Sequence, residues 1–343
     1  MIQAHLDRIE AVNHKLNAVT VVLEKDALRM ASEADRQIAA GKELGPLHGV
    51  PVTLKENIDL VGSATTHGVV DLKESMPQTD APVVSHLKQA GAIPIGRTNL
   101  PDFGLRWHTN NDLRGATLNP WDPSRTPGGS SGGEAVAIAT GMSPLGVGND
   151  MGGSLRYPSQ CCGITSLKPT FGRVSRIATS IFTDPPLFYD QFACVNGPMA
   201  RHVQDLRLAL DIMSQPDPRD PCWTPALRLG SAMPGPIKVA LTTDPAGYGG
   251  SPVVAEGVRK AADVLASAGY ILEEIDPPSV GESAQIIQQI SVMEFKSYLP
   301  EMLPIICEEA KIVLERIIGD TKPDLPTYMK AIAKRHRIAH ECL

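Results

Sequence analysis

Hydrophobic residues recur with a helical period over the first 41 residues of the chain. In residues 5–19 (HLDRIEAVNHKLNAV) the spacing of three or four positions is kept by Leu6, Ile9, Val12 and Leu16. Residues 26–41 repeat the pattern and end at Gly41. Such spacing places apolar side chains on one face of a helix, and a glycine commonly ends it. Two helices are therefore expected at the start of the chain.

Helix and strand patterns then follow one another along the chain. Residues 48–60 (HGVPVTLKENIDL) alternate Val50, Val52 and Leu54 before polar residues, which predicts a short strand. Residues 79–98 read as a helix with Pro82 in its first turn and then a strand, and residues 133–150 repeat this step. Such steps are typical of an α/β fold.

The second half of the chain continues in the same way. It predicts a helix at 201–213, a strand at 237–243, a helix at 253–269, a strand at 270–276 and helices beyond about 282. The proline-rich stretch from Gln215 to Pro236 interrupts the pattern and is expected to be a surface excursion. Because strands flank it without a change in composition, we expect one α/β domain over residues 1–343.

Composition narrows the functional classes. The chain has 343 residues, 42% hydrophobic and 20% charged, with a net charge of −6 and no cluster of Lys and Arg, so we expect no nucleic-acid partner. Residues 1–10 lack the apolar core of a signal peptide, and no run of about 20 apolar residues predicts a membrane span. The cysteines show no CxxC pair and are expected to be reduced thiols: Cys161, Cys162, Cys194, Cys222, Cys307 and Cys342. These features favour the cytoplasm.

The stretch RTPGGSSGGEAVA (125–137) is the strongest candidate for chemistry. A phosphate-binding P-loop would need a lysine after the glycines, and none lies between Gly128 and Ala137. A linker is not expected between two structured segments. The G-x-S-x-G elbow of α/β-hydrolases needs a preceding strand, whereas LNPWDPSRTP contains three prolines. A catalytic loop with partners elsewhere in the chain remains.

Two further segments supply such partners. The turn NDMGGSLRYP offers Ser154 and backbone N–H groups that could converge on an oxyanion, beside the charged pair Asp150 and Arg156. Lys55 ends the apolar run of residues 50–54, and burial lowers the pKa of a lysine until it can act as a neutral base.

These segments together resemble the amidase signature family. The resemblance rests on GVPVTLKENIDL, on the GGSSGG loop and the GGSLR turn at their separation, and on NGPMARHVQDLRLALDIM, and it covers about residues 45–213. It implies an α/β/α layered domain around a mixed, twisted sheet. It also implies a Ser–cis-Ser–Lys triad in which Ser154 is the nucleophile, Ser130 follows a cis peptide bond and Lys55 is the base.

The remaining roles follow from the same resemblance. The N–H groups of Met151, Gly152, Gly153 and Ser154 would bind the oxyanion, and Ser131, Asp150 and Arg156 would support the two loops. Family members usually have a smaller or branched residue in place of Met151, so the turn is expected to be slightly reshaped. They also usually continue beyond the position of Leu343, so the C-terminal part is expected to be shortened.

The expected activity is hydrolysis of a small-molecule carboxylic amide through a seryl acyl-enzyme, with no metal or organic cofactor. The alternatives are a carboxylesterase, the glutaminase component of an aminoacyl-tRNA amidotransferase and, outside the enzymes, a binding or scaffold protein. Homo-oligomerisation is left open. An apolar or aryl acyl group could contact Phe182, Phe188, Tyr189 and Phe192, although a plain core cluster explains them equally. Trp107, His108 and Asn110 likewise fit either a pocket or the core.

Overall fold

A computed structural model describes the chain except for residues 178–186, 227–229, 231–234, 323 and 343. The chain forms two compact units. Unit 1 comprises residues 1–226 and 300–316, and unit 2 comprises residues 227–299 and 317–343. The expectation of a single domain over residues 1–343 stays a prediction.

Unit 1 is built on a mixed six-stranded sheet. Its strands, in the order β1-β3-β2-β4-β6-β5, are β1 (Val19–Val22), β3 (Ile93–Thr98), β2 (Pro51–Lys55), β4 (Leu145–Asp150), β6 (Val195–Ala200) and β5 (Thr165–Ser166). The three central strands β3, β2 and β4 run parallel, whereas β1, β6 and β5 pair antiparallel to their neighbours. The helices that lie entirely in this unit are α1 (Ile2–Leu16), α2 (Glu24–Ala39), α3 (Pro82–Gln89), α4 (Gly132–Ala139), α5 (Arg156–Cys162), α6 (Phe188–Ala193) and α7 (Val203–Met213), with short 3₁₀ turns at Val70–Leu72 and Asp102–Gly104.

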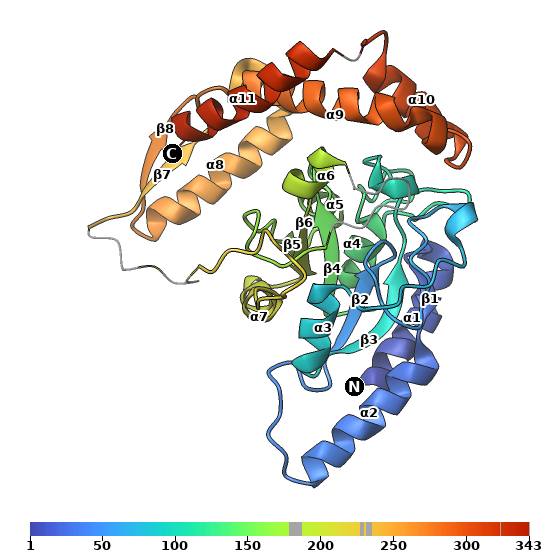
Figure 1. Ribbon diagram of the computed structural model, residues 1–343. Coiled ribbons are helices and arrows are strands. Elements are labelled where there is room, and N and C mark those ends of the chain that lie inside the picture. The colour runs from blue at the N-terminus through green and yellow to red at the C-terminus, as the bar shows by residue number, and fades with distance from the viewer. Residues whose placement is uncertain (178–186, 227–229, 231–234, 323, 343) are drawn as a thin grey trace. The chain divides into compact units, whose positions relative to one another are not determined.

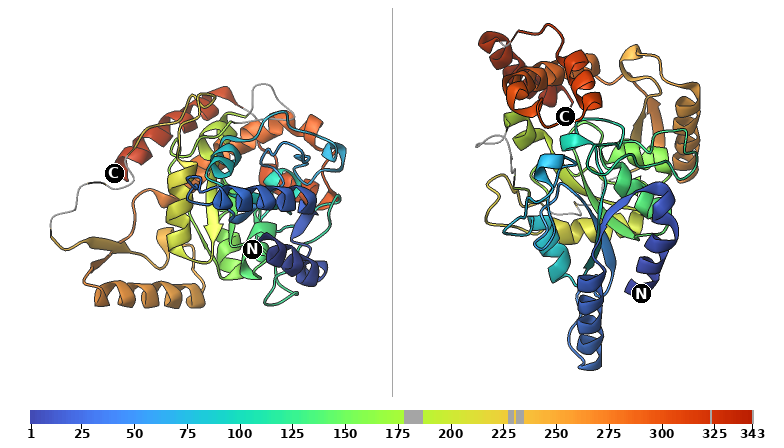
Figure 2. Two further views of the ribbon diagram at one scale, coloured as in Figure 1. Left: turned by 90° about the horizontal axis from the view of Figure 1, so that it is seen from below. Right: turned by 90° about the vertical axis from the view of Figure 1, so that its right-hand side faces the viewer.

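Helices cover both faces of this sheet. One hydrophobic core joins α3 and α7 to β2, β4 and β6, and a second core joins α1, α2, α4 and α5 to β1 and β3. Figures 1 and 2 show α3 and α7 on one side of the sheet and α1 and α2 on the other. The layered α/β fold with a mixed sheet is therefore confirmed.

Strand β2 shows how this layering positions the candidate lysine. Val52 and Leu54 are fully buried in the core beneath α3 and α7. Because successive side chains of a strand point to opposite faces, Thr53 and Lys55 face the other side, where Thr53 bonds to Glu134 of α4. The lysine thus faces the layer that contains the helix after the glycine and serine loop.

The secondary structure differs from the sequence prediction at three strands and at the short helices α5 and α6, which were not predicted. The first two helices are present, but β1 lies between them, and β5 and β6 were not predicted. Strand β6 contains Gly197 and Pro198, which disfavour a strand in isolation, yet it pairs with β4 over its whole length. Tertiary pairing outweighs local propensity here.

Unit 2 follows the predicted pattern. Strands β7 (Lys238–Leu241) and β8 (Ile271–Glu274) pair in parallel and are connected through α8 (Pro252–Ser267). Three further helices follow: α9 (Val280–Met302), α10 (Glu308–Ile318) and α11 (Leu325–Glu341), of which residues 300–316 belong to unit 1.

The structure also bears on the expectations about the cysteines and about membrane-spanning segments. All six cysteines are free thiols. Within the described part of the chain, no helix combines the length and apolar composition that crossing a membrane requires.

Candidate active site

Lys55 ends β2 and is completely buried. Its Nζ donates hydrogen bonds to Ser130 Oγ at 2.6 Å and to Asn149 Oδ1 at 2.7 Å. The structure therefore brings together the lysine and the first serine of the candidate triad, although 75 positions separate them along the chain.

Burial lowers the pKa of Lys55 to about 7, because the ammonium form loses its hydration. Electrostatic interactions with Cys194, Asp150 and Glu134 act in the opposite direction and limit this decrease. A substantial fraction of Lys55 is thus neutral near pH 7 and can accept a proton. This is the electrostatic state that a general base requires.

Hydrogen bonds link the end of the glycine and serine loop to the two strands beside this lysine. The Gly129–Ser130 peptide bond is cis, and Ser130 is 2% exposed. Helix α4 begins at Gly132, and its buried Glu134 carboxylate accepts hydrogen bonds from Thr53 of β2 and from Thr98 of β3. Thr98 is the register partner of Lys55, so Glu134 fastens the loop to both strands at the level of the lysine.

A buried carboxylate organises the turn after β4. Asp150 accepts hydrogen bonds from the N–H groups of Gly153 (2.8 Å) and Leu155 (3.0 Å) and two from the Arg156 guanidinium (both 3.0 Å). Burial raises the pKa of Asp150, but the hydrogen bonds from Arg156, Gly153 and Leu155 outweigh burial and hold that pKa below its usual range. The charged pair expected beside the turn is formed.

This arrangement corrects one expectation about the oxyanion donors. The Gly153 N–H bonds to Asp150 and so does not point toward an oxyanion. Of the four N–H groups expected to bind the oxyanion, those of Met151, Gly152 and Ser154 remain, because the Gly153 N–H donates to a carboxylate oxygen of Asp150.

Ser154 lies where the two loops meet. It is 8% exposed, and its carbonyl oxygen accepts a hydrogen bond of 3.3 Å from the Ser131 N–H. The Ser131 hydroxyl in turn donates to the Asn149 carbonyl at 3.4 Å. Among the hydrogen bonds of the described residues, none joins the Ser130 and Ser154 hydroxyls. The loops are adjacent, but the second link of the expected relay is not formed in this structure.

Asn149 is a site residue that the sequence analysis missed. Its side-chain oxygen accepts from Lys55, and its Nδ2 donates to Asn57 Oδ1 at 3.0 Å. Its position in the sequence could have indicated this role, because polar residues at the end of a buried strand commonly face a site in α/β proteins. Asn149 precedes Asp150 at the end of β4.

The expected pocket residues are only partly placed. Phe182 lies outside the described residues. Phe188, Tyr189 and Phe192 of α6 form one cluster, with ring centroids 4.7 Å apart for Phe188 and Phe192 and 5.6 Å apart for Tyr189 and Phe192. A cavity of about 200 Å³ beside α6 is lined by its Gln191 but by none of these three rings. Their role as a substrate wall stays a prediction.

Trp107 contacts the turn after β4. It is 64% exposed, which rules out the core interpretation, and its indole N–H donates to the Gly152 carbonyl at 3.1 Å. His108 is also exposed, and its ring bonds to Thr126 Oγ1.

Comparison with known proteins identifies the family to which a chain with this site is similar. The family model described as Amidase matches residues 1–341. The chain is 50% identical over 279 residues to an indoleacetamide hydrolase of Bradyrhizobium diazoefficiens, a match that covers 81% of this chain and 53% of that protein. It is 38% identical over 306 residues to a glutamyl-tRNA(Gln) amidotransferase component of Carboxydothermus hydrogenoformans, covering 87% of this chain and 61% of that protein.

Solved structures agree with the sequence comparisons. The structure of 6-aminohexanoate cyclic dimer hydrolase complexed with substrate matches with a TM-score of 0.82 and 27% identity, covering 100% of this chain and 72% of that one. The present chain spans between about half and three fifths of the two curated relatives described above. The family match, however, extends over nearly all of its residues, and the chain therefore belongs to the amidase family.

Proposed function

We propose that the protein hydrolyses a carboxylic amide through an acyl-enzyme formed on Ser154. The observation that carries the proposal is the 2.6 Å hydrogen bond between Lys55 Nζ and Ser130 Oγ in a fully buried position. A lysine placed in this way, with a pKa of about 7, can take a proton from a serine and so activate a poor nucleophile.

The residues act in sequence. Neutral Lys55 accepts the proton of Ser130, Ser130 accepts that of Ser154, and the Ser154 oxygen attacks the amide carbonyl carbon. The N–H groups of Met151, Gly152 and Ser154 stabilise the resulting oxyanion, a device commonly worth about 3 to 4 kcal/mol for each donor.

Collapse of the tetrahedral intermediate breaks the carbon–nitrogen bond, and the proton held by the relay passes to the leaving amine. Ser131 supports this loop and assists that transfer. Water then attacks the acyl-enzyme with the same base and regenerates Ser154.

The proposed substrate is a small primary amide with an aryl acyl group, such as indole-3-acetamide. The support is the 50% identity to an indoleacetamide hydrolase. Hydrolysis of an ester with the same acyl group uses the same groups and is a secondary activity. Glutamine hydrolysis within an amidotransferase is the second candidate, because the chain is 38% identical to a component of such an enzyme. We also propose that the protein acts in the cytoplasm and can form homo-oligomers.

The test combines covalent labelling with turnover. The full chain is treated with a fluorophosphonate, the modified serine is mapped, and ammonia release is measured with indole-3-acetamide and with glutamine. Labelling at Ser154 that is lost in Lys55→Ala, together with ammonia from the aryl amide, is the expected result. Ser32→Ala, which removes an exposed hydroxyl on α2, is the matched control.

Other outcomes reject parts of the proposal. Labelling at Ser130 would exchange the roles of the two serines. Ammonia from glutamine alone would favour the amidotransferase reaction, and the absence of labelling would contradict an active site in this chain.

A further inference from the structure

The hydrogen bond between Trp107 and the oxyanion turn has no role in the mechanism above. The bond joins an exposed indole to the Gly152 carbonyl across 45 positions of the chain. Packing into a hydrophobic core does not account for the position of a side chain that is 64% exposed. The contact itself therefore needs an explanation.

The peptide unit between Gly152 and Gly153 is held at both ends. Its carbonyl oxygen accepts from Trp107 at 3.1 Å, and its N–H donates to Asp150 Oδ1 at 2.8 Å. Because a trans peptide is planar, with its oxygen and hydrogen on opposite sides, these two bonds together fix the rotation of the whole unit. One of these hydrogen bonds, here called clamps, is made by Asp150 at the end of β4, and the other by Trp107.

Without these two hydrogen bonds, the backbone around this peptide unit would be free to rotate, because glycine permits a wide range of φ and ψ. Glycines flank it on both sides, and Gly153 has a φ of +108°. A Cβ atom built at either glycine would meet no atom within 4 Å, so no neighbouring group packs against the side-chain positions of these two residues. A rotation would turn the Gly152 carbonyl toward the Asp150 carboxylate and redirect the neighbouring N–H groups.

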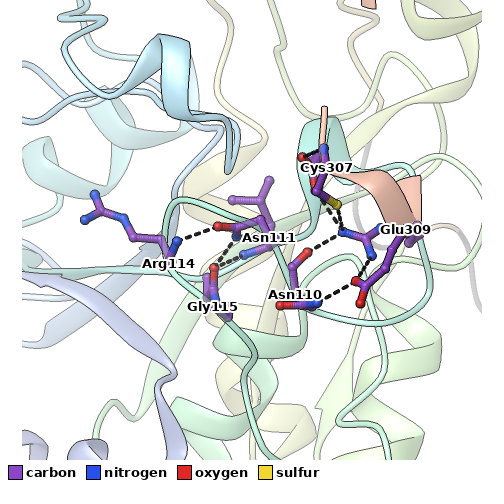
Figure 3. Close-up of polar contacts among 10 residues, drawn as sticks. Asn110, Asn111, Arg114, Gly115, Cys307 and Glu309 are labelled. Atoms are coloured by element: carbon purple, nitrogen blue, oxygen red, sulfur yellow. Dashed lines mark hydrogen bonds and ion pairs between the residues drawn. The ribbon is translucent and has the colours of Figure 1, made fainter. Parts of the chain in front are cut away.

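Trp107 is suited to this task because its own segment is anchored. The Arg106 guanidinium, 6% exposed, bonds to Asp102 Oδ2 at 2.8 Å and to Glu309 Oε2 at 2.9 Å. The Cys307 N–H donates to Asp102 at 2.9 Å, and Asn110 donates to Glu309 at 2.6 Å. Figure 3 shows Cys307 and Glu309 gathered beside Asn110.

The same segment also packs against the serine loop. A Cβ atom at Gly129 would lie 2.7 Å from the Arg106 carbonyl oxygen and 2.8 Å from the His108 nitrogen. Only a glycine therefore permits this approach, and the backbone on either side of Trp107 rests directly on the residue before Ser130. One segment thus contacts both loops of the site.

We propose that Trp107 is a positioning residue for the oxyanion turn. With Asp150 it holds the Gly152–Gly153 peptide in one orientation, and thereby aims the N–H groups of Met151, Gly152 and Ser154 at the tetrahedral intermediate. The inference rests on the proposed function, because it assigns a role within that acyl-transfer site.

The experiment compares two tryptophans that make the same kind of bond. Trp107→Phe keeps an aromatic ring and removes the N–H donor. Trp121→Phe is the matched control, because Trp121 is 74% exposed and its indole N–H donates to the Cys162 carbonyl at 2.8 Å. For each full-length variant, kcat and KM for indole-3-acetamide are measured with the affinity for phenylboronic acid, which forms a tetrahedral adduct with an active serine.

We expect Trp107→Phe to reduce kcat about 3- to 10-fold, the effect of one hydrogen bond, with KM within about 2-fold of the wild type. The affinity for phenylboronic acid should fall by the same factor, whereas Trp121→Phe should change neither quantity. Unchanged urea midpoints for both variants verify that each folds.

Two outcomes overturn the inference. A raised KM with the wild-type kcat would show that the ring contacts substrate and does not orient the turn. Wild-type values of kcat and boronate affinity in Trp107→Phe would show that the turn needs no second clamp. If the proposed function is wrong, the wild type itself will neither be labelled at Ser154 nor bind phenylboronic acid, which distinguishes this case from the two outcomes above. The role proposed for Trp107 would then be rejected as well.

Discussion

Replacing Lys55 by methionine should abolish activity and yet stabilise the protein at neutral pH. In the folded chain the pKa of Lys55 is about 7, against an ordinary lysine pKa of 10.5. The unfolded chain therefore binds more protons than the folded one between these two values, and unfolding is favoured as the pH falls through that range. The destabilisation is absent above about pH 10.5 and complete below about pH 7.

The magnitude follows from the shift. One pKa unit corresponds to about 1.4 kcal/mol, so the buried lysine costs about 4 kcal/mol at pH 7 and about 2 kcal/mol at pH 9. Methionine removes this cost but leaves Ser130 Oγ and Asn149 Oδ1 without their donor, at about 1 to 3 kcal/mol together when they find other partners. We expect Lys55→Met to be about 1 to 3 kcal/mol more stable than the wild type at pH 7 and within about 1 kcal/mol of the wild type at pH 9, so that its advantage falls by about 2 kcal/mol between the two pH values.

Urea unfolding followed by tryptophan fluorescence measures this difference. All three tryptophans, Trp107, Trp121 and Trp223, belong to unit 1, which also contains Lys55. Lys25→Met, at an exposed position on α2, is the control and should show no pH-dependent difference from the wild type. A difference between Lys55→Met and the wild type that stays constant from pH 7 to pH 9 would refute the reasoning, because the lysine would then be charged in the folded state.

Further predictions concern the groups around Lys55. The kcat/KM of the wild type should rise with pH through an apparent pKa near 7, because the neutral lysine is the base; a flat profile from pH 6 to pH 8 would contradict this assignment. Burial raises the pKa of Glu134 to about 7, so this group is only partly ionised over the same pH range. Glu134→Gln should therefore move the acid limb only modestly to lower pH, because Glu134 raises the pKa of Lys55, and an unchanged limb would show that Glu134 does not act on the lysine. Asp150→Asn should lower the free energy of unfolding at pH 7 by about 1 to 3 kcal/mol. Because the pKa of Asp150 is lowered in the folded state, its stabilisation is lost on acidification, and urea unfolding should show the difference shrinking below about pH 4.

The clamp formed by Glu134 shows why the candidate triad could not be assembled from spacing alone. The sequence places Thr53 and Lys55 on one face of a strand and places Glu134 in the first turn of a helix. Only the parallel pairing of β2 with β3 brings Thr98 beside Lys55, so that one carboxylate bonds to both strands. The order of the strands in a sheet depends on contacts between distant segments, which local patterns do not encode.

What the sequence alone determined was the class of fold, most of the helices and the residue types for the chemistry. Helical periods, strand alternation and the glycine and serine loop are local properties, and they pointed to an α/β protein with Lys55, Ser130 and Ser154 as its candidates. Three strands escaped the sequence analysis for different reasons: β1 directly follows the first helical pattern, β5 has only two residues, and β6 contains Gly197 and Pro198, so that its place in the sheet depends on pairing and not on propensity.

Tertiary structure decided how the donors of the site are used. The sequence offered four consecutive N–H groups, and the folded chain assigns that of Gly153 to Asp150. It also brings Asn149 to Lys55 and Trp107 to Gly152, pairs that lie 94 and 45 positions apart. The physical reason is the same in each case: a hydrogen bond depends on direction and distance in space, and these are fixed only when the sheet, its two helical layers and the segment around Trp107 pack together.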